Sequence, residues 1–218
     1  MSCISSGMVP GCSRSLAAWV NRSSLTAWGY ELWRVRALSL LSGRPFPLEE
    51  ELALMRQAVA PVEGGLFLDL GCATGLYARA LLAAGAARVY ALDCSPAMLR
   101  VAHHKARSYA GFVPLLACAE AIPLPDEALD GVVVGGSWNE FEEPGKVVQE
   151  MYRVLRPGGR LWVMFAHRSE GPLQRFLERT GLRFPTLSGL LEQLGEGGFR
   201  VEGRRERLVG FVAGTKVT

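Results

Sequence analysis

Hydrophobic and polar positions follow two alternating patterns along most of the chain. Leu48, Leu52, Met55 and Val59 recur at the spacing of one helix face, and residues 66–70 then form an apolar run of strand length. The alternation continues to residue 166. It predicts strands at 66–70, 88–93, 112–118, 131–136 and 160–166, and helices at 48–60, 75–86, 95–109 and 143–156.

The C-terminal part completes the predicted fold. Residues 172–180 and 186–196 have helical patterns, and residues 199–217 resemble two strands around a charged turn. Strands that alternate with helices form a largely parallel sheet covered by helices on both faces. We therefore expect an α/β fold in which a ligand binds at the carboxyl ends of the parallel strands.

The N-terminal segment differs from the rest in composition. Residues 1–30 hold seven Ser and two Arg, and no acidic residue precedes Glu31. We expect residues 1–24 to be disordered, or to be present because the start of the protein was assigned too far upstream. An organellar transit peptide is the less favoured alternative. Residues 25–47 are expected to form a helical segment that covers the site, and residues 48–218 the main domain.

Composition excludes several classes of protein. The chain has 218 residues and a net charge of +3, which fits one domain and makes nucleic acid an unlikely main partner. No apolar run reaches the roughly 18 residues of a transmembrane helix. The five cysteines are odd in number and form no CxxC pair, which favours a cytoplasmic chain without disulfides. The three histidines and the cysteines do not have the sequence spacing of a zinc site, so we expect no metal.

Polar and small residues gather directly after the predicted strands. Asp69–Gly75 follows the first strand, Asp93 the second, Cys118–Glu120 the third and Gly135–Asn139 the fourth. A glycine after a strand lets the backbone approach a ligand, and an acid after the next strand can accept bonds from both ribose hydroxyls. The loop is G-x-x-x-G and not G-x-G-x-x-G, and no GK[ST] follows. These positions predict a nucleoside ligand other than a dinucleotide or a nucleoside triphosphate.

Together these motifs resemble class I S-adenosylmethionine-dependent methyltransferases, in particular the small-molecule branch that includes the ubiquinone/menaquinone-biosynthesis type. The resemblance spans about residues 52–166 and rests on FLDLGCATG, VYALDCSPAML, AEAIPLPD and EMYRVLRPGGRLWVMF. It implies a Rossmann-like, doubly wound, mostly parallel seven-stranded sheet with an antiparallel C-terminal hairpin, and S-adenosyl-L-methionine as cofactor. The cofactor-binding residues that it implies are Asp69, Gly71, Cys72, Ala73, Gly75, Asp93, Cys94, Met98, Cys118, Ala119, Glu120, Gly135 and Tyr30.

Two positions depart from the family pattern. Ala73 replaces a frequent glycine, which is tolerable if its φ is negative. Cys118 stands where an acid often accepts a bond from the adenine amino group, and a thiol is a much weaker acceptor. We expect cofactor binding that is weaker or less selective for adenine, unless Glu120 substitutes for the missing acid.

The acceptor is expected to be small and partly apolar, because no large cap follows the sheet. Candidate substrate contacts are Trp28, Trp138, Asn139 and His167. No catalytic base is convincing. The resemblance implies an enzyme that transfers a methyl group by in-line displacement, and we expect it to be a monomer or homodimer. The alternatives are an RNA or protein methyltransferase, and a catalytically inactive S-adenosylmethionine-binding protein.

Overall fold

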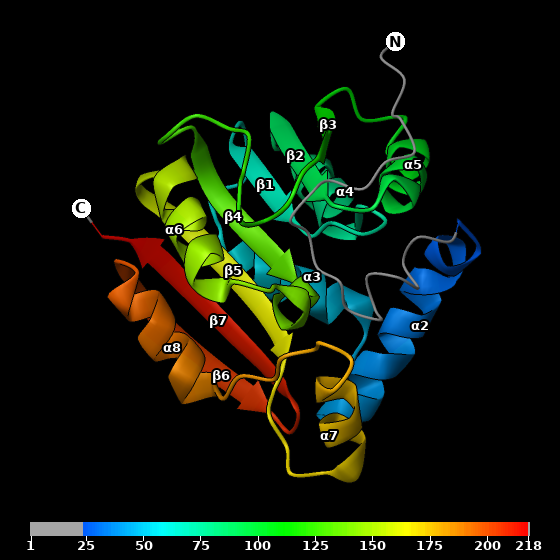
Figure 1. The fold of residues 1–218 in the computed structure, drawn as a ribbon. Coiled ribbons are helices and arrows are strands. Elements are labelled where there is room, and N and C mark those ends of the chain that lie inside the picture. Colours follow the sequence, from blue (N-terminus) through cyan, green and yellow to red (C-terminus); the bar gives the residue numbers. More distant parts are fainter. Residues whose placement is uncertain (1–23, 218) are drawn as a thin grey trace.

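The computed structural model describes residues 24–217, without the side chains of residues 24–30, 32 and 33. Its centre is a seven-stranded sheet in the order β3-β2-β1-β4-β5-β7-β6 (Figure 1). Strands β1 to β5 are parallel, and β7 runs antiparallel to both of its neighbours, β5 and β6. The predicted α/β fold with a mostly parallel sheet and an antiparallel C-terminal hairpin is confirmed.

The elements follow the predicted order. The strands are β1 Leu66–Leu70, β2 Arg88–Asp93, β3 Phe112–Leu116, β4 Leu129–Gly135, β5 Leu155–Ala166, β6 Phe199–Glu206 and β7 Val209–Lys216. The helices are α2 Ser24–Ser42, α3 Leu48–Ala58, α4 Leu76–Ala83, α5 Pro96–Lys105, α6 Pro144–Val154, α7 Pro172–Glu178 and α8 Leu187–Glu196, with the short 3-10 helix η1 at Ser137–Glu140.

The boundary between α6 and β5 differs from the prediction. The helix ends at Val154, and β5 begins at Leu155, five residues before the predicted start at 160. Leu155 pairs with Leu129 of β4 while Arg160 pairs with Gly131, so residues 156–159 of β5 lie opposite the single residue Asp130. Pro157 has no N–H to donate and the glycines bend freely, which is why this stretch forms an irregularity within the strand.

Two apolar layers hold the helices against the sheet. Phe67 of β1 belongs to the layer under α2 to α5, and its neighbour Leu68 belongs to the layer under α6 and α8. Successive side chains of a strand point to opposite faces, so one short strand contributes to both layers. The arrowheads of β4 and β5, which mark the carboxyl ends of these strands, point to the side where α2 and α7 lie (Figure 1).

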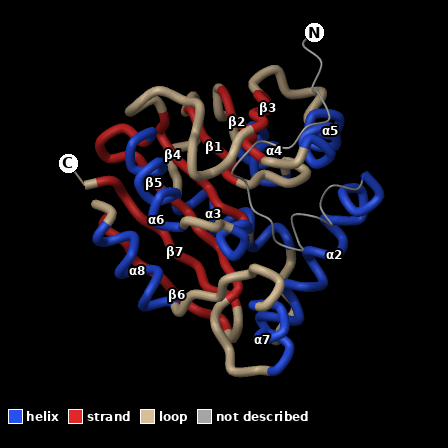
Figure 2. Tube along the Cα trace, in the orientation of Figure 1, coloured by secondary structure: helices blue, strands red, loops and turns tan. Residues whose placement is uncertain are grey.

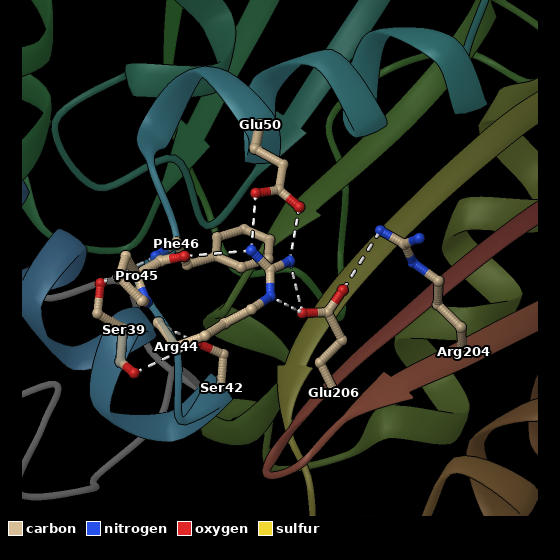
Figure 3. Close-up of polar contacts among 8 residues, drawn as sticks. All are labelled: Ser39, Ser42, Arg44, Pro45, Phe46, Glu50, Arg204 and Glu206. Atoms are coloured by element: carbon tan, nitrogen blue, oxygen red, sulfur yellow. Dashed lines mark hydrogen bonds and ion pairs between the residues drawn. The ribbon is translucent and has the colours of Figure 1, made fainter.

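The connection between α2 and α3 is joined to the β6–β7 turn (Figure 3). Arg44 forms ion pairs with Glu50 at 2.6 Å and with Glu206 at 2.7 Å. Phe46 is buried and stacks on Phe211 with ring centroids 5.7 Å apart. Exposed ion pairs contribute about 0–1 kcal/mol, whereas full burial of a Phe side chain contributes about 1.5–3 kcal/mol. The aromatic contact therefore supplies most of the stability of this junction.

Candidate functional site

The loop after β1 turns sharply under the expected ligand position. Gly71, Ala73 and Gly75 have φ values of +72°, +47° and +74°. A Cβ on Gly71 would overlap Ser137, whose Oγ donates to the Leu70 carbonyl at 2.8 Å. Glycine at position 71 thus lets the loops after β1 and β4 touch. The condition set for Ala73, a negative φ, is not met: this alanine adopts the left-handed conformation, which is unfavourable for a residue with a Cβ.

Asp69 caps helix α4 from the strand before it. Its Oδ2 accepts from the Ala78 N–H at 2.9 Å, and the residue that precedes the helix, Gly75, has no side chain to do so. Burial raises the pKa of Asp69 to about 7, although the Ala78 N–H and the charge of Arg34 favour the carboxylate. The structure therefore gives Asp69 a role in fixing the loop, and a contact with the methionine moiety stays a prediction.

Asp93 joins the loops that follow β1 and β2. Its Oδ2 accepts from the Ala73 N–H and its Oδ1 from the Ser95 N–H, both at 2.8 Å. Burial raises its pKa, and the backbone N–H groups of Ser95, Ala73 and Cys94 oppose this shift. Each carboxylate oxygen has a second lone pair, so Asp93 retains acceptor capacity for two hydroxyl groups. Its role in holding a ribose remains a prediction that the geometry supports.

The three cysteines at the strand ends differ in state. Cys72 is buried and Cys94 is half-buried, and both are free thiols. Burial raises the pKa of Cys72 well above its usual range and that of Cys94 to about 12, with the charge of Asp93 adding to both shifts. Cys118 is disulfide-bonded. The expectation of a chain without disulfides is therefore wrong for this residue, and its sulfur has no thiol hydrogen to share with a ligand.

The remaining predicted cofactor residues vary in their surroundings. Met98 is buried and packs with Val101 against Ala73, directly beside the loop. Ala119 is buried, and Glu120 accepts from the backbone N–H of Glu142 at 3.2 Å. One carboxylate oxygen of Glu120 thus already accepts a hydrogen bond from the segment before α6. Tyr30 and Trp28 are in α2, but their side chains lie outside the described residues.

Two of the candidate substrate contacts are built into the core. The Trp138 side chain is 2% exposed and packs edge-on against Phe141. The Asn139 amide donates to the carbonyls of Ala166 and Arg183 and accepts from the Ala166 N–H. These contacts explain why a polar residue is buried here. Contacts of Trp138 and Asn139 with an acceptor stay predictions.

His167 follows β5 and is also largely buried. Its Nδ1 lies 2.8 Å from the Arg168 carbonyl oxygen, and its backbone N–H donates to the Leu208 carbonyl. The ring packs against Phe165 with centroids 6.2 Å apart. A contact between His167 and an acceptor stays a prediction.

A buried polar group that the sequence analysis did not predict lies beside Gly135. Arg34 donates to the Gly135 carbonyl at 2.6 Å and forms an ion pair with Glu51, whose carboxylate also accepts from the Tyr77 hydroxyl. The Trp162 indole N–H approaches the same hydroxyl at 3.4 Å. A signal existed, because Glu51 follows Leu48 by three residues and precedes Met55 by four, on the buried face of α3.

Helix α2 contacts the loop after β1 through Glu31. The Glu31 carboxylate accepts from Thr74 at 2.7 Å, Arg79 at 2.6 Å and Lys105 at 2.9 Å. Burial disfavours the charge of Glu31, but these hydrogen bonds and cations outweigh it and lower its pKa. We call Glu31, Thr74, Arg79 and Lys105 the Glu31 cluster. It joins the predicted covering segment 25–47 to the glycine-containing loop.

Glu140 ends the short helix after β4 and faces the same edge of the sheet. Burial raises its pKa to about 7, and the charge of Asp93 adds to the shift. Among the described residues, no hydrogen-bond donor stabilises the Glu140 carboxylate. A carboxyl group with a pKa near neutrality can both hold and accept a proton at physiological pH.

The residues present fit a nucleoside with a sulfonium methionine side chain in most respects. Asp93 offers acceptors for ribose hydroxyls, and the tight turn at Gly71 packs the loop after β1 against Ser137 in the loop after β4. The adenine side lacks the usual acid, since Cys118 is a disulfide sulfur. In the part of the chain that the structure describes, no group of His, Cys, Asp or Glu could hold a metal ion. Within the same residues, every helix is too short or too polar to cross a bilayer.

Comparison with known proteins supports this assignment. The family model described as "Methyltransferase domain" matches residues 68–163. A demethylmenaquinone methyltransferase of Clavibacter sepedonicus is 36% identical over 119 residues, which are 55% of this chain and 48% of that protein. The chain spans about half the length of the curated relatives it matches.

Two solved structures share the fold. A SAM-dependent methyltransferase from Aquifex aeolicus has a TM-score of 0.64 at 23% identity, over 77% of this chain and 90% of the other. The [4+2]-cyclase SpnF has a TM-score of 0.71 at 20% identity, over 95% of this chain and 99% of the other. A cyclase and a methyltransferase therefore have the same fold, and at these identities the likeness shows the fold alone.

Proposed function

We propose, from the premise that this chain carries a class I S-adenosylmethionine-dependent methyltransferase domain, that it transfers a methyl group to a small, partly apolar acceptor. S-adenosylmethionine is the cofactor of this family, and when bound it supplies a methyl group activated by the sulfonium charge. Such a donor needs no further activation, so the protein's contribution is mainly to hold both reactants close and aligned.

The observation that carries this proposal is the junction made by Asp93. One carboxylate fixes the loop after β1 through Ala73 and the start of α5 through Ser95, while facing the edge where the strands end. A carboxylate in this position, beside a backbone turn that Asp69 holds through α4, supports a role for Asp93 as the ribose acceptor. Both acids would lose this geometry if the loop were displaced.

Glu140 is the proposed proton acceptor. It ends η1 at the same sheet edge as Asp93, and burial together with the Asp93 charge raises its pKa to about 7. An oxygen or activated carbon acceptor must lose a proton when it is methylated, and a base whose pKa matches the working pH performs this best. The expected result is a rate that rises with pH through about 7 and loses this dependence in Glu140→Gln.

The alternatives keep the same cofactor site. An RNA or protein methyltransferase would need a larger contact surface, and the segment between β5 and α8 offers only the short helix α7. A catalytically inactive binding protein is favoured by Cys118, whose sulfur is an inadequate partner for adenine. Turnover of any acceptor would exclude that alternative.

The test is a thermal-shift measurement with S-adenosylmethionine, S-adenosylhomocysteine and NAD. Ligand at about 100 times its Kd stabilises the folded state by about 2.7 kcal/mol, or about 5–10 °C for a chain of this size. We expect a shift with the two sulfur nucleosides alone, and its loss in Asp93→Asn. Asp126→Asn is the matched control, because Asp126 is exposed and pairs with Arg153. No shift with either sulfur nucleoside at millimolar concentration would overturn the proposal.

A further inference from the structure

Helix α7 has the reverse of the usual surface orientation. Its polar residue Gln174 is buried, whereas Leu173 and Phe176 are 70% and 59% exposed. A surface helix normally turns its apolar face to the core. Here Gln174 fixes the opposite arrangement, because its side chain accepts from the Ser169 N–H and donates to the His167 carbonyl at 3.0 Å.

A third exposed apolar residue lies on the neighbouring element. Leu40 of α2 is 76% exposed. Both elements are linked to Leu208 in the β6–β7 turn. The Leu208 N–H donates to the Leu41 carbonyl of α2, and the Leu208 carbonyl accepts from the N–H of His167, whose own carbonyl accepts from Gln174 of α7. In the single orientation shared by Figures 1 and 2, α7 is drawn at the C-terminal end of α2. Exposed leucine and phenylalanine thus gather on one side of the molecule, whereas exposed Val217 is near the C-terminus.

The surroundings of these residues are basic. Residues 167–185 hold four arginines and two glutamates, and one of those glutamates, Glu178, lies 3.9 Å from Arg168. Arg175 and Arg179 are exposed on α7 itself, and Arg36 is exposed on α2 one helical turn before Leu40. Apolar side chains with arginines around them are typical of segments that lie in the interface of an anionic membrane.

We propose that Leu40, Leu173 and Phe176, with Arg175 and Arg179, form a surface that docks onto an anionic lipid bilayer. We call this surface the α7 patch. Contact between two copies through the same patch would bring arginines against arginines, which opposes association. A bilayer that contains anionic headgroups instead attracts the arginines and accepts the apolar side chains. This inference goes beyond the proposed function and does not depend on it.

The test is co-sedimentation of the full chain with lipid vesicles. We expect binding to phosphatidylcholine vesicles that contain about one third phosphatidylglycerol, weaker binding as salt screens the arginines, and no binding to pure phosphatidylcholine. Phe176→Ser and Leu173→Ser should each weaken binding about tenfold by removing a buried apolar group. Arg175→Gln should weaken it about fivefold. Val217→Ser and Arg200→Gln are the matched controls and should bind like the unchanged chain.

Two results would overturn the proposal. The first is absence of binding to anionic vesicles at low salt, or binding that Phe176→Ser and Leu173→Ser leave unchanged. The second is a concentration-dependent dimer that both substitutions abolish, which would assign the α7 patch to a second copy of the chain. The thermal shift with S-adenosylmethionine is measured on the same variants. If a variant loses vesicle binding but keeps its thermal shift with S-adenosylmethionine, its loss of membrane docking does not come from a loss of cofactor binding.

Discussion

At the scale of single residues, Ala73 is the position where conformation and site conflict. Its φ of +47° is left-handed, and its N–H must point at Asp93 to donate the 2.8 Å hydrogen bond. A left-handed residue with a Cβ costs about 1–2 kcal/mol, and the added freedom of glycine in the unfolded chain offsets part of any gain. Ala73→Gly should therefore raise the free energy of unfolding by up to about 1 kcal/mol, measured by urea denaturation.

A matched substitution separates this effect from a general response to glycine. Ala84 follows α4 with a φ of −89°, so Ala84→Gly relieves no strain and should lower stability. If Ala73→Gly is as destabilising as Ala84→Gly, the left-handed conformation of Ala73 is not a source of strain.

The free thiols near Asp93 should be unreactive despite their place at the site. Burial and the charge of Asp93 raise the pKa of Cys94 to about 12, compared with about 8.5 for an ordinary thiol. Only the thiolate reacts, so alkylation of Cys94 at pH 7.5 should be about 10³ times slower in the folded chain than in guanidinium. Mass spectrometry after iodoacetamide treatment measures this ratio. Rapid labelling of Cys94 in the folded protein would show that the thiolate is stabilised there.

Some site residues could be predicted from the sequence and others could not. Gly71 directly follows β1 and Asp93 is the last residue of β2, and the end of a strand is visible in the local pattern. Glu51 and Ser137 are different, because their roles depend on Arg34 and on the Leu70 carbonyl, which come from distant parts of the chain. Contacts between distant segments have no local signal, so the sequence pattern predicted no partner for Glu51 or Ser137.

At the scale of elements, local signals set most boundaries. Helix α5 begins where predicted, since Ser95 accepts from the Met98 N–H at 3.3 Å and Pro96 occupies the first turn. The boundary between α6 and β5 was wrong because it depends on the register between Leu129 and Leu155. Pro157 and the glycines after it have the local signature of a turn, but pairing with β4 extends the strand across them.

The Glu31 cluster makes α2 an element whose attachment can be tested. Glu31 accepts from Thr74, which is fully buried, and from two cations. Glu31→Ala leaves the Thr74 hydroxyl without this acceptor and should destabilise α2 by about 1–3 kcal/mol. Hydrogen exchange should then accelerate in the backbone of residues 31–42 and remain unchanged in β1 and β4.

Two further variants test whether the hydrogen bond to Thr74 or the charge of Glu31 holds α2 in place. Glu31→Gln keeps an acceptor for Thr74 but loses the charge, so its effect should lie between those of the unchanged chain and Glu31→Ala. Glu49→Gln on α3 alters an exposed carboxylate and should leave exchange in α2 as it was. Equal exchange in all variants would mean that α2 is held by its apolar contacts alone.

At the scale of the whole molecule, the orientation of the surface helix α7 is less predictable from the sequence than the fold. Apolar periodicity was sufficient to predict one sheet with helices on both faces, because burial of both faces is what the pattern encodes. The exposure of Leu173 and Phe176 was not predictable, since their spacing on α7 is that of an ordinary buried face. Gln174 decides the orientation of that helix through hydrogen bonds to residues 167 and 169, which only the folded chain brings together.

The whole molecule should also be more stable in mild acid than at alkaline pH. Burial raises the pKa of Asp69 and of Glu140 to about 7, whereas in the unfolded chain they are near 3.8 and 4.5. Between about pH 4 and 7 the folded state therefore holds protons that the unfolded state has lost, so stability falls as pH rises through this range and then stays constant.

Glu31 and Glu150, whose pKa values are lowered, act in the opposite direction only below about pH 4.5. Asp69 and Glu140 should each contribute about 2.5 kcal/mol, so the free energy of unfolding should be about 5 kcal/mol higher at pH 5 than at pH 8 in urea titrations. Glu140→Gln should remove about half of that difference, and Glu49→Gln, a substitution at an exposed position of α3, should remove none. A pH-independent stability would mean that water reaches both carboxylates, and it would also remove the basis for Glu140 as the proton acceptor.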